Sequence, residues 1–288
     1  MKKAPKLCFA LQNGLWVSIK SVPKGLACHC HCPACGSKLI ARKGKQQQHH
    51  FAHYHGNICE GSVETALHLL GKELIAKSSE LMLAAVQTYQ GPQLRAPHLL
   101  SYQGAQQEVG FKGLIIDVLL QSAGKPLAIE LKVSHASTSK KQYLLIKHGL
   151  ACLEIDLLSI YGELWANGKG GDLEHFKQAL LYKETHRVWL FHPRKHKWEF
   201  GALKQATPKK VNHSKQADYH HYLVYRCPKS NRFIRNGFRE GQAYARVFQD
   251  CMHCDSCREI AYQKEWVGFK QVNRKPLVVY CLVKNARR

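Results

Sequence analysis

The sequence predicts a mixed α/β protein whose central core is flanked by two small Cys/His metal-binding modules. Nine of the twelve cysteines fall in two clusters, between residues 28 and 59 and between residues 227 and 257. Between them, a segment with apolar residues at helical spacing precedes two strand-like apolar runs separated by a turn. We therefore expect domains at 1–60, 61–205 and 219–288, with a polar linker at 206–218.

The composition is that of a globular protein, and it is strongly basic. Hydrophobic residues make up 45% of the 288 residues, which excludes a collagen-like or wholly disordered chain. The 43 lysines and arginines exceed the 20 acids, so the formal net charge is +23. Such an excess predicts a polyanionic partner, usually nucleic acid, although a basic solvated surface would give the same composition.

Neither a membrane span nor a secretory signal is expected. No apolar run approaches about 20 residues, and polar residues at 12–14 interrupt the N-terminal apolar stretch. We therefore expect a cytoplasmic protein without a membrane partner. In that reducing compartment, clustered cysteines are metal ligands more often than disulfides.

The N-terminal cluster has the spacing of a zinc site. Cys32 and Cys35 are two residues apart and a glycine follows, so both sulfurs can turn towards one ion. A tetrahedral site needs two further ligands, and the candidates are His50, His53 and Cys59. We expect four of these five residues to bind zinc, and we favour the set Cys32, Cys35, His53 and Cys59. The alternative is an exposed basic loop with reactive thiols.

The C-terminal cluster consists of Cys227, Cys251, Cys254 and Cys257. Its two-residue spacings suit zinc, and they also suit an iron–sulfur cluster. Zinc is favoured because no proline follows a fourth cysteine in the run. Three cysteines stand alone among apolar residues and are expected to be small core residues: Cys8, Cys152 and Cys281.

Basic and aromatic residues alternate between the C-terminal ligands. The basic ones are Arg232, Arg235, Arg239 and Arg246, and the aromatic ones are Phe233, Phe238, Tyr244 and Phe248. Cations bind phosphates, and aromatic faces stack on unpaired bases. We expect the arginines to contact nucleic acid and most of the aromatic rings to form the small core of the module.

The middle of the chain begins with a predicted helix over residues 62–87, for which Ser62 is a suitable N-cap. Glu64, His68 and Lys72 are four residues apart and so share one face of that helix. The face is either an ordinary solvated one or the one that meets the next segment.

Two strands follow, at residues 111–120 and 127–133, and they carry the candidate chemistry. Asp117 is a lone acid in the first, while Glu130 and Lys132 share a face of the second. A carboxylate within an apolar strand is costly to bury unless it is paired or binds a metal. A hairpin would bring the three together as a Mg²⁺ site with a lysine beside the attacking water. A helix at 137–148 and a third strand at 150–158 complete the predicted core.

The residues Asp117 and Glu130-Leu131-Lys132 resemble the motif of the PD-(D/E)XK nuclease superfamily. With the preceding CPxCG and HFAH sequences, the helix that carries Glu64, and the strand sequence IELKVSH, residues 26–158 resemble the competence protein CoiA-like family. Ile116 stands where the family has a proline, which is not a ligand. The resemblance does not extend to the C-terminal third.

The resemblance implies a restriction-endonuclease-like core. Asp117 and Glu130 would ligate Mg²⁺ or Mn²⁺ with the Leu131 carbonyl, Lys132 would orient or deprotonate water, and Glu64 would be a further acid of the site. Weaker candidates near the same face are His68, Lys72, Ser134 and Lys141.

The implied function is hydrolysis of DNA phosphodiester bonds, in DNA uptake, recombination or foreign-DNA processing. One alternative is a zinc-dependent nucleic-acid-binding protein with a degenerate nuclease core. The other is a defence or restriction-like nuclease that needs a partner. The sequence has no P-loop motif, so any ATPase or helicase activity would come from a partner protein.

Overall fold

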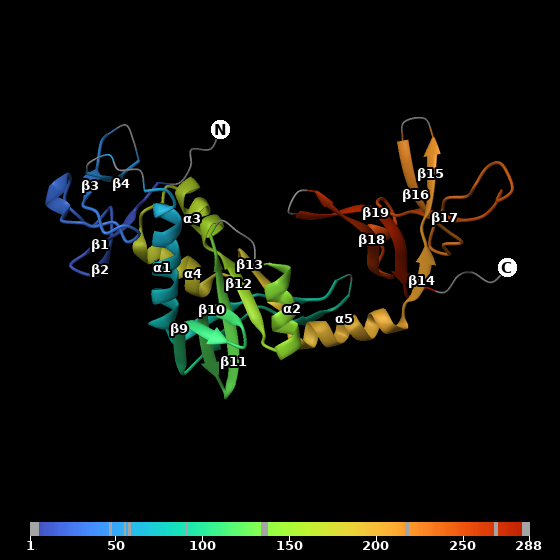
Figure 1. Cartoon of the computed structure of the whole chain (residues 1–288), viewed down its shortest axis with the longest axis horizontal. Helices are drawn as coiled ribbons and strands as arrows, with labels where there is room; N and C mark the ends of the chain where they lie inside the picture. The colour runs from blue at the N-terminus through green and yellow to red at the C-terminus, as the bar shows by residue number, and fades with distance from the viewer. Residues whose placement is uncertain are drawn as a thin grey trace. The chain divides into compact units, whose positions relative to one another are not determined.

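A computed structural model of the chain describes residues 6–45, 48–54, 56, 59–89, 91–133, 138–216, 219–267 and 270–283. The chain divides into two compact units, and its mixed α/β class is as predicted (Figure 1). Unit 1 comprises Met1–Val86 and Arg95–Pro193, and unit 2 comprises Gln87–Leu94 and Arg194–Arg288. Within the described part, no helix has both the length and the apolar character needed to cross a bilayer.

Unit 1 is built on a five-stranded sheet with the order β13-β12-β11-β10-β9. Its strands are β9 (Gly104–Phe111), β10 (Leu114–Ser122), β11 (Lys125–Lys132), β12 (Cys152–Asp156) and β13 (Arg187–Phe191). The predicted hairpin is β10 and β11, which are antiparallel. β12 runs parallel to β11, and α2 (Ser139–His148) provides the crossover between them.

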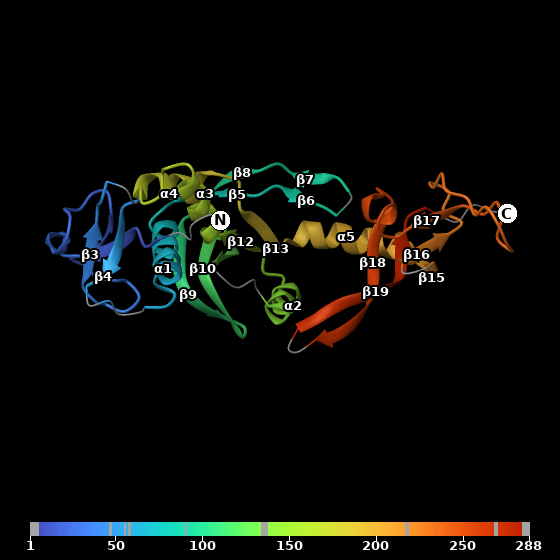
Figure 2. The same cartoon turned by 90° about the horizontal axis from the view of Figure 1, so that it is seen from above.

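Helices cover both faces of this sheet. One hydrophobic cluster joins the sheet to α1 (Ser62–Ala76), α3 (Leu157–Ala166) and α4 (Leu173–Tyr182). A second, smaller cluster includes Leu145 of α2 and lies on the opposite face. Figure 2 shows α1 and α2 on opposite sides of the strands.

Several predicted elements have different bounds in the structure. The strand expected from residue 111 begins at Leu114, because Lys112 and Gly113 both have positive φ, 46° and 84°, and form a tight turn after β9. The strand expected to reach residue 158 ends at Asp156, whose carboxylate accepts a hydrogen bond from the Ser159 backbone N–H at 2.8 Å and caps α3. The helix expected at 137–148 begins at Ser139, and its predicted first residue lies outside the described part.

The predicted helix at 62–87 ends much earlier, at Ala76. The segment after it forms β5 (Glu80–Leu83) and β6 (Val86–Gln87). The Ser78 hydroxyl donates to the Glu80 carbonyl and accepts from its N–H, and this local turn competes with helical hydrogen bonding. β5 pairs with β8 (His98–Ser101), whereas β6 pairs with β7 (Gln93–Arg95). Long-range pairing therefore overrides the helical periodicity here.

The N-terminal module consists of two hairpins and a short 3₁₀ helix. These are β1 (Phe9–Gln12) with β2 (Leu15–Ser18), β3 (Leu39–Arg42) with β4 (His50–His53), and η1 (Leu26–Cys28). The module belongs to unit 1 rather than forming a separate domain at 1–60. The Phe9 ring packs 5.8 Å from Tyr161 and 5.4 Å from Phe176, so the module and the helices share one core.

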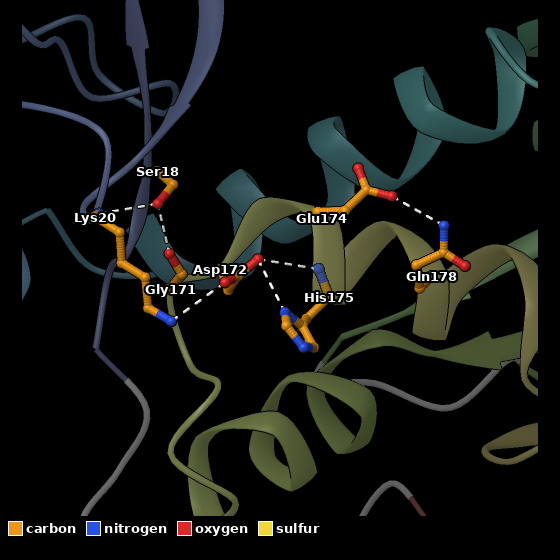
Figure 3. A network of polar contacts seen from close by, with 7 residues as sticks. All are labelled: Ser18, Lys20, Gly171, Asp172, Glu174, His175 and Gln178. Atoms are coloured by element: carbon orange, nitrogen blue, oxygen red, sulfur yellow. Dashed lines mark hydrogen bonds and ion pairs between the residues drawn. The ribbon is translucent and has the colours of Figure 1, made fainter.

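A polar network fastens the module to the start of α4 (Figure 3). The buried Ser18 hydroxyl donates to the Gly171 carbonyl at 2.6 Å, and the Lys20 ammonium lies 3.3 Å from the Asp172 carboxylate. Asp172 also caps α4 by accepting a hydrogen bond from the His175 N–H at 3.1 Å. The Asp172 carboxylate therefore both caps α4 and binds Lys20 of the N-terminal module.

We expect Gly171→Ala to destabilise unit 1 by about 2–4 kcal/mol, as measured by chemical denaturation. Gly171 has a φ of +76°, and a Cβ there would lie 2.7 Å from Ile19 Cγ2 and 3.1 Å from Cys8 Cβ. The backbone strain contributes about 1–2 kcal/mol and the overlap about 1–3 kcal/mol. Gly168→Ala is the matched control, since Gly168 has a φ of +70° with nothing within 4 Å of its Cβ position. Equal losses for the two variants would contradict the close approach.

We expect the difference in unfolding free energy between the wild type and Asp172→Asn to depend on pH. Burial opposes ionisation of Asp172, but hydrogen bonds from His175 and Lys20 outweigh it and lower the pKa from 3.8 to about 2. A carboxyl whose folded pKa is depressed stabilises the fold above its unfolded pKa, and that contribution is lost as the pH falls towards 2. The unfolding free energy of the wild type should therefore exceed that of Asp172→Asn by at most about 1 kcal/mol at pH 6, and by less at pH 3. A difference in unfolding free energy that is the same at both pH values would exclude stabilisation by the ionised Asp172 carboxylate.

Unit 2 consists of α5 (Pro193–Gln205) and two three-stranded sheets. One sheet has the order β14-β19-β18 and the other β15-β16-β17. The bounds are β14 (Thr207–Lys210), β15 (Asn212–Gln216), β16 (Tyr219–Tyr225), β17 (Tyr244–Arg246), η2 (Cys251–His253), β18 (Cys257–Val267) and β19 (Lys270–Cys281).

The linker expected at 206–218 therefore forms two strands, β14 and β15, over most of its described residues. β14 pairs antiparallel with β19, β15 pairs with β16, and Val211 between them is buried. The segment is polar because few of its side chains enter the core. The backbone of β14 pairs with the distant strand β19, and this pairing is not apparent from local composition.

Candidate functional site

The N-terminal cluster brings together four ligand groups suited to zinc. One ligand atom from each of Cys32, Cys35, His53 and Cys59 lies within 4.8 Å of all the others. Cys32 and Cys35 lie in a turn closed by a 2.8 Å hydrogen bond from the Gly36 N–H to the Cys32 carbonyl. His53 ends β4, and Cys59 precedes α1. This is the set favoured from the sequence, and it could hold a zinc ion.

His50 is not part of this cluster. Its Nδ1 lies 2.9 Å from the Gln48 carbonyl, and its side chain is buried. Successive residues of a strand point to opposite faces, so His50 and His53, three apart on β4, point in opposite directions. The remaining ligands include one thiol that ionises readily. Hydrogen bonds from Ser37 lower the pKa of Cys35 to about 6.

The second site lies where β10 and β11 separate. Their paired register begins at Val118 and Ile129, and Asp117 stands just outside it. Asp117 Oδ2 accepts a 2.8 Å hydrogen bond from the Leu131 N–H and lies 3.2 Å from His68 Nε2 on α1. Burial opposes ionisation of Asp117, but these two partners outweigh it and its pKa is lowered. Asp117 is therefore held as a carboxylate.

Glu130 faces the same site from β11 and is strongly buried. Its side chain is 7% exposed, and its Oε2 forms an ion pair with the Lys141 ammonium of α2. Its other oxygen, Oε1, is buried and finds no hydrogen-bond partner among the described residues. Burial raises the pKa of Glu130 to about 7, and the neighbouring charge of Asp117 adds to this effect.

The two lysines near the site have different partners. Lys132 Nζ lies 2.8 Å from Asp156 Oδ2, and Asp156 is its direct neighbour in the parallel β11–β12 register. This contact raises the pKa of Lys132. The lysine that contacts Glu130 is Lys141, near the start of α2. From the sequence, Lys141 was only a weaker candidate. The Asp117 and Glu130-Leu131-Lys132 motif does not show the crossover that brings α2 back to the sheet.

The predicted helix face of Glu64, His68 and Lys72 does meet the sheet. Besides the contact between His68 and Asp117, the buried Lys72 forms an ion pair with Glu108 of β9. Glu108 has a φ of 51° and interrupts the β9–β10 register beside Asp117. Glu64 is half-buried in the first turn of α1, and Ser134 lies outside the described residues.

The C-terminal cysteines line one cavity in unit 2 rather than a tight cluster. Among the described residues, only the N-terminal set brings three or more ligand atoms within 4.8 Å of one another. The cavity is lined by Cys227, Cys251, Cys254, Cys257 and also Cys281. Cys281 is a buried core residue of this module, as expected, and β19 also brings it back to the start of β18, beside the clustered cysteines.

The arginines between these cysteines differ in their contacts. Arg232 Nε lies 3.1 Å from Asp250 Oδ2, and the Arg239 guanidinium lies 4.3 Å from the centre of the Tyr225 ring. Arg235 is exposed, and Arg246 is half-buried.

The aromatic residues of this segment are mostly at the surface, contrary to expectation. Phe233, Phe238 and Phe248 are exposed. The core of the module is formed instead by small aliphatic residues and cysteines.

A further aromatic and basic surface on α5 was missed. His196 stacks on Phe200 at 6.1 Å with an interplanar angle of 15°, and the Lys204 ammonium lies 4.6 Å from the Phe200 ring centre. These residues are four apart, so the helical spacing of residues 196, 200 and 204 is a signal that could have revealed this face.

Comparison with known proteins identifies the N-terminal module. Residues 24–62 match the family model described as competence protein CoiA, N-terminal domain. This segment, rather than the whole chain, is similar to that domain. No curated protein and no solved structure matches the chain.

The CoiA-like segment contains all four ligands of the N-terminal cluster and ends at the start of α1. The match ends before the site at Asp117 and Glu130.

Proposed function

We propose that the chain is a Mg²⁺-dependent deoxyribonuclease with a restriction-endonuclease-like core. The observation that carries this proposal is the buried Oε1 of Glu130, which has no partner among the described residues and lies in a site shared with Asp117. A buried carboxylate oxygen without a partner is costly, and a cation would satisfy it. Two carboxylates from adjacent strands are ligands that Mg²⁺ or Mn²⁺ prefers.

Asp117 and Glu130 stand beside each other on the adjacent strands β10 and β11. They would hold the ion. When bound, the ion would polarise the phosphate and make water a better nucleophile. His68 and the Leu131 N–H orient Asp117 through its Oδ2. Lys141 neutralises Glu130 through Oε2, so Oε1 remains for the ion.

DNA is the proposed substrate because unit 2 is basic. Residues 194–288 contain 21 lysines and arginines against 7 acids. The Phe200 face of α5 combines rings and cations, which suits stacking on unpaired bases as well as phosphate binding. Helicase or ATPase activity would come from a recombination partner.

A nucleic-acid-binding protein with a degenerate core is the second candidate. The observation that favours it is the 2.8 Å pair of Lys132 with Asp156, since a lysine that orients water is not expected to be held in an ion pair. Under this hypothesis the pair stabilises the sheet and has no catalytic role.

The test is incubation of the purified full chain with linear or circular DNA, single- or double-stranded, and with RNA. Each substrate is combined with Mg²⁺, Mn²⁺ or a chelator. The proposal expects cleavage of DNA that requires the divalent ion. Binding without cleavage under every condition would favour the second candidate.

We expect Lys132→Met to lower the rate of DNA cleavage about 10²-fold or more, because the lysine positions the attacking water. Asp156→Asn is the matched variant. It removes the partner of Lys132, yet asparagine still caps α3. Asp156→Asn should therefore retain most of the activity. Equal losses in the two variants, accompanied by equal losses of thermal stability, would show that the pair is structural.

A further inference from the structure

The cavity lined by five cysteines in unit 2 has a volume of about 550 Å³ and lies beside the β14-β19-β18 sheet. Cys257 and Cys281 are directly opposite each other in the antiparallel β18–β19 register. Residues in this position have Cβ atoms about 4.5–5.5 Å apart on the same face of the sheet. The two thiols are therefore neighbours at one wall of the cavity, although 23 residues separate them in sequence.

Lys209 faces the same cavity from β14. It pairs with Val279 in the β14–β19 register, and Cys281 is two residues further along β19, on the same face. The side chain of Lys209 is only 6% exposed, and its Nζ finds no partner in the part of the chain that the structure describes. An ammonium buried without a counter-charge is unfavourable, so an anion beside it is stabilising. The cavity is thus built to receive negative charge.

Lys229 also lines the cavity, but its charge is already balanced. Its Nζ lies 2.5 Å from the Asp255 carboxylate, and both side chains are well exposed. Arg232, a further cation of the lining, is paired with Asp250 at 3.1 Å. The unmatched cation is therefore Lys209, and the remaining groups able to become anionic are the thiols.

We propose that this cavity holds a metal centre with four thiolate ligands, that Cys281 is one of them, and that Lys209 balances the charge of the centre. Four thiolates around Zn²⁺ carry a net charge of −2, and four thiolates around a [4Fe–4S]²⁺ cluster carry the same charge. Each thiol loses its proton to solvent as its sulfur bonds to the metal, and no electron is transferred. Since no three ligand atoms here lie within 4.8 Å of one another, the sulfurs must move together on binding.

Elemental analysis of the full reduced chain tests the number of centres. The wild type should carry about two centres, one in each module. Cys281→Ser should carry about one. Cys152→Ser is the matched control, because Cys152 is also buried but lies in the sheet of unit 1. This variant should keep both metal centres. Inorganic sulfide and iron would identify a cluster, whereas zinc alone would identify a tetrahedral site, and both support the proposal.

Two further measurements apply even if Cys281→Ser does not fold. In the wild type, maleimide labelling of Cys281 should rise with that of Cys257 when a chelator is added, while Cys152 stays protected. In Lys209→Met, which keeps an apolar stem, the metal should pass to the chelator about tenfold faster or more. The proposal would be overturned by any of three results. These are labelling of Cys281 that does not change when the chelator is added, a Cys281→Ser chain that still carries both metal centres, and an unchanged rate of metal transfer in Lys209→Met.

Discussion

Glu130→Gln and Asp117→Asn are each expected to lower the rate of Mg²⁺-dependent DNA cleavage by about 10³-fold or more, to the level of the chelated wild type. Both changes keep the shape of the side chain and remove a charged oxygen ligand. The double variant should be no worse than either single one, because groups that act as a unit lose activity non-additively. The measurement is the initial rate of cleavage at saturating Mg²⁺.

Stability separates this loss from unfolding. Burial raises the pKa of Glu130 to about 7, so a neutral glutamine in its place removes an unfavourable buried charge. The thermal midpoint of Glu130→Gln without metal should therefore stay at or above that of the wild type. Glu163→Gln is the control, since this exposed carboxylate pairs with His186 away from the site. Full cleavage by Glu130→Gln would show that the catalytic site is elsewhere.

Loss of the N-terminal zinc is expected to unfold the N-terminal module formed by β1–β4 and η1. Structural zinc contributes roughly 10 kcal/mol or more to the folding of small modules, so Cys32→Ser should lose one ion and most of the soluble yield. The module shares its core with α3 and α4 and donates a 2.9 Å hydrogen bond from Trp16 Nε1 to Glu73 of α1. Unfolding should therefore also lower the thermal midpoint of unit 1.

Cys152→Ser is the control for the removal of a buried thiol, because Cys152 lies outside both cysteine clusters. Metal content and limited proteolysis of the two variants provide the comparison. A wild-type chain that contains no zinc and resists proteolysis equally with and without a chelator would refute the structural role of this site.

Short-range spacing determined the parts of this protein that form within a few residues. The close approach of Cys32 and Cys35 was predicted because its geometry follows from residues adjacent in sequence. The β10–β11 hairpin was predicted for the same reason: two apolar runs joined by a turn pair with each other. The position of Asp117 beside Glu130 follows directly from that hairpin.

Tertiary structure decided which distant groups meet. The parallel register of β11 and β12 sets Lys132 against Asp156, and the crossover helix brings Lys141 to Glu130. Likewise, β19 carries Cys281 to Cys257, and β14 forms where composition indicated a linker.

The physical reason is common to all these cases. Local periodicity reports which face of an element is apolar, whereas partners across a sheet are chosen by hydrogen-bond register and by burial of the whole face. Those choices depend on residues that are distant in the chain, so they appear only once the fold is assembled.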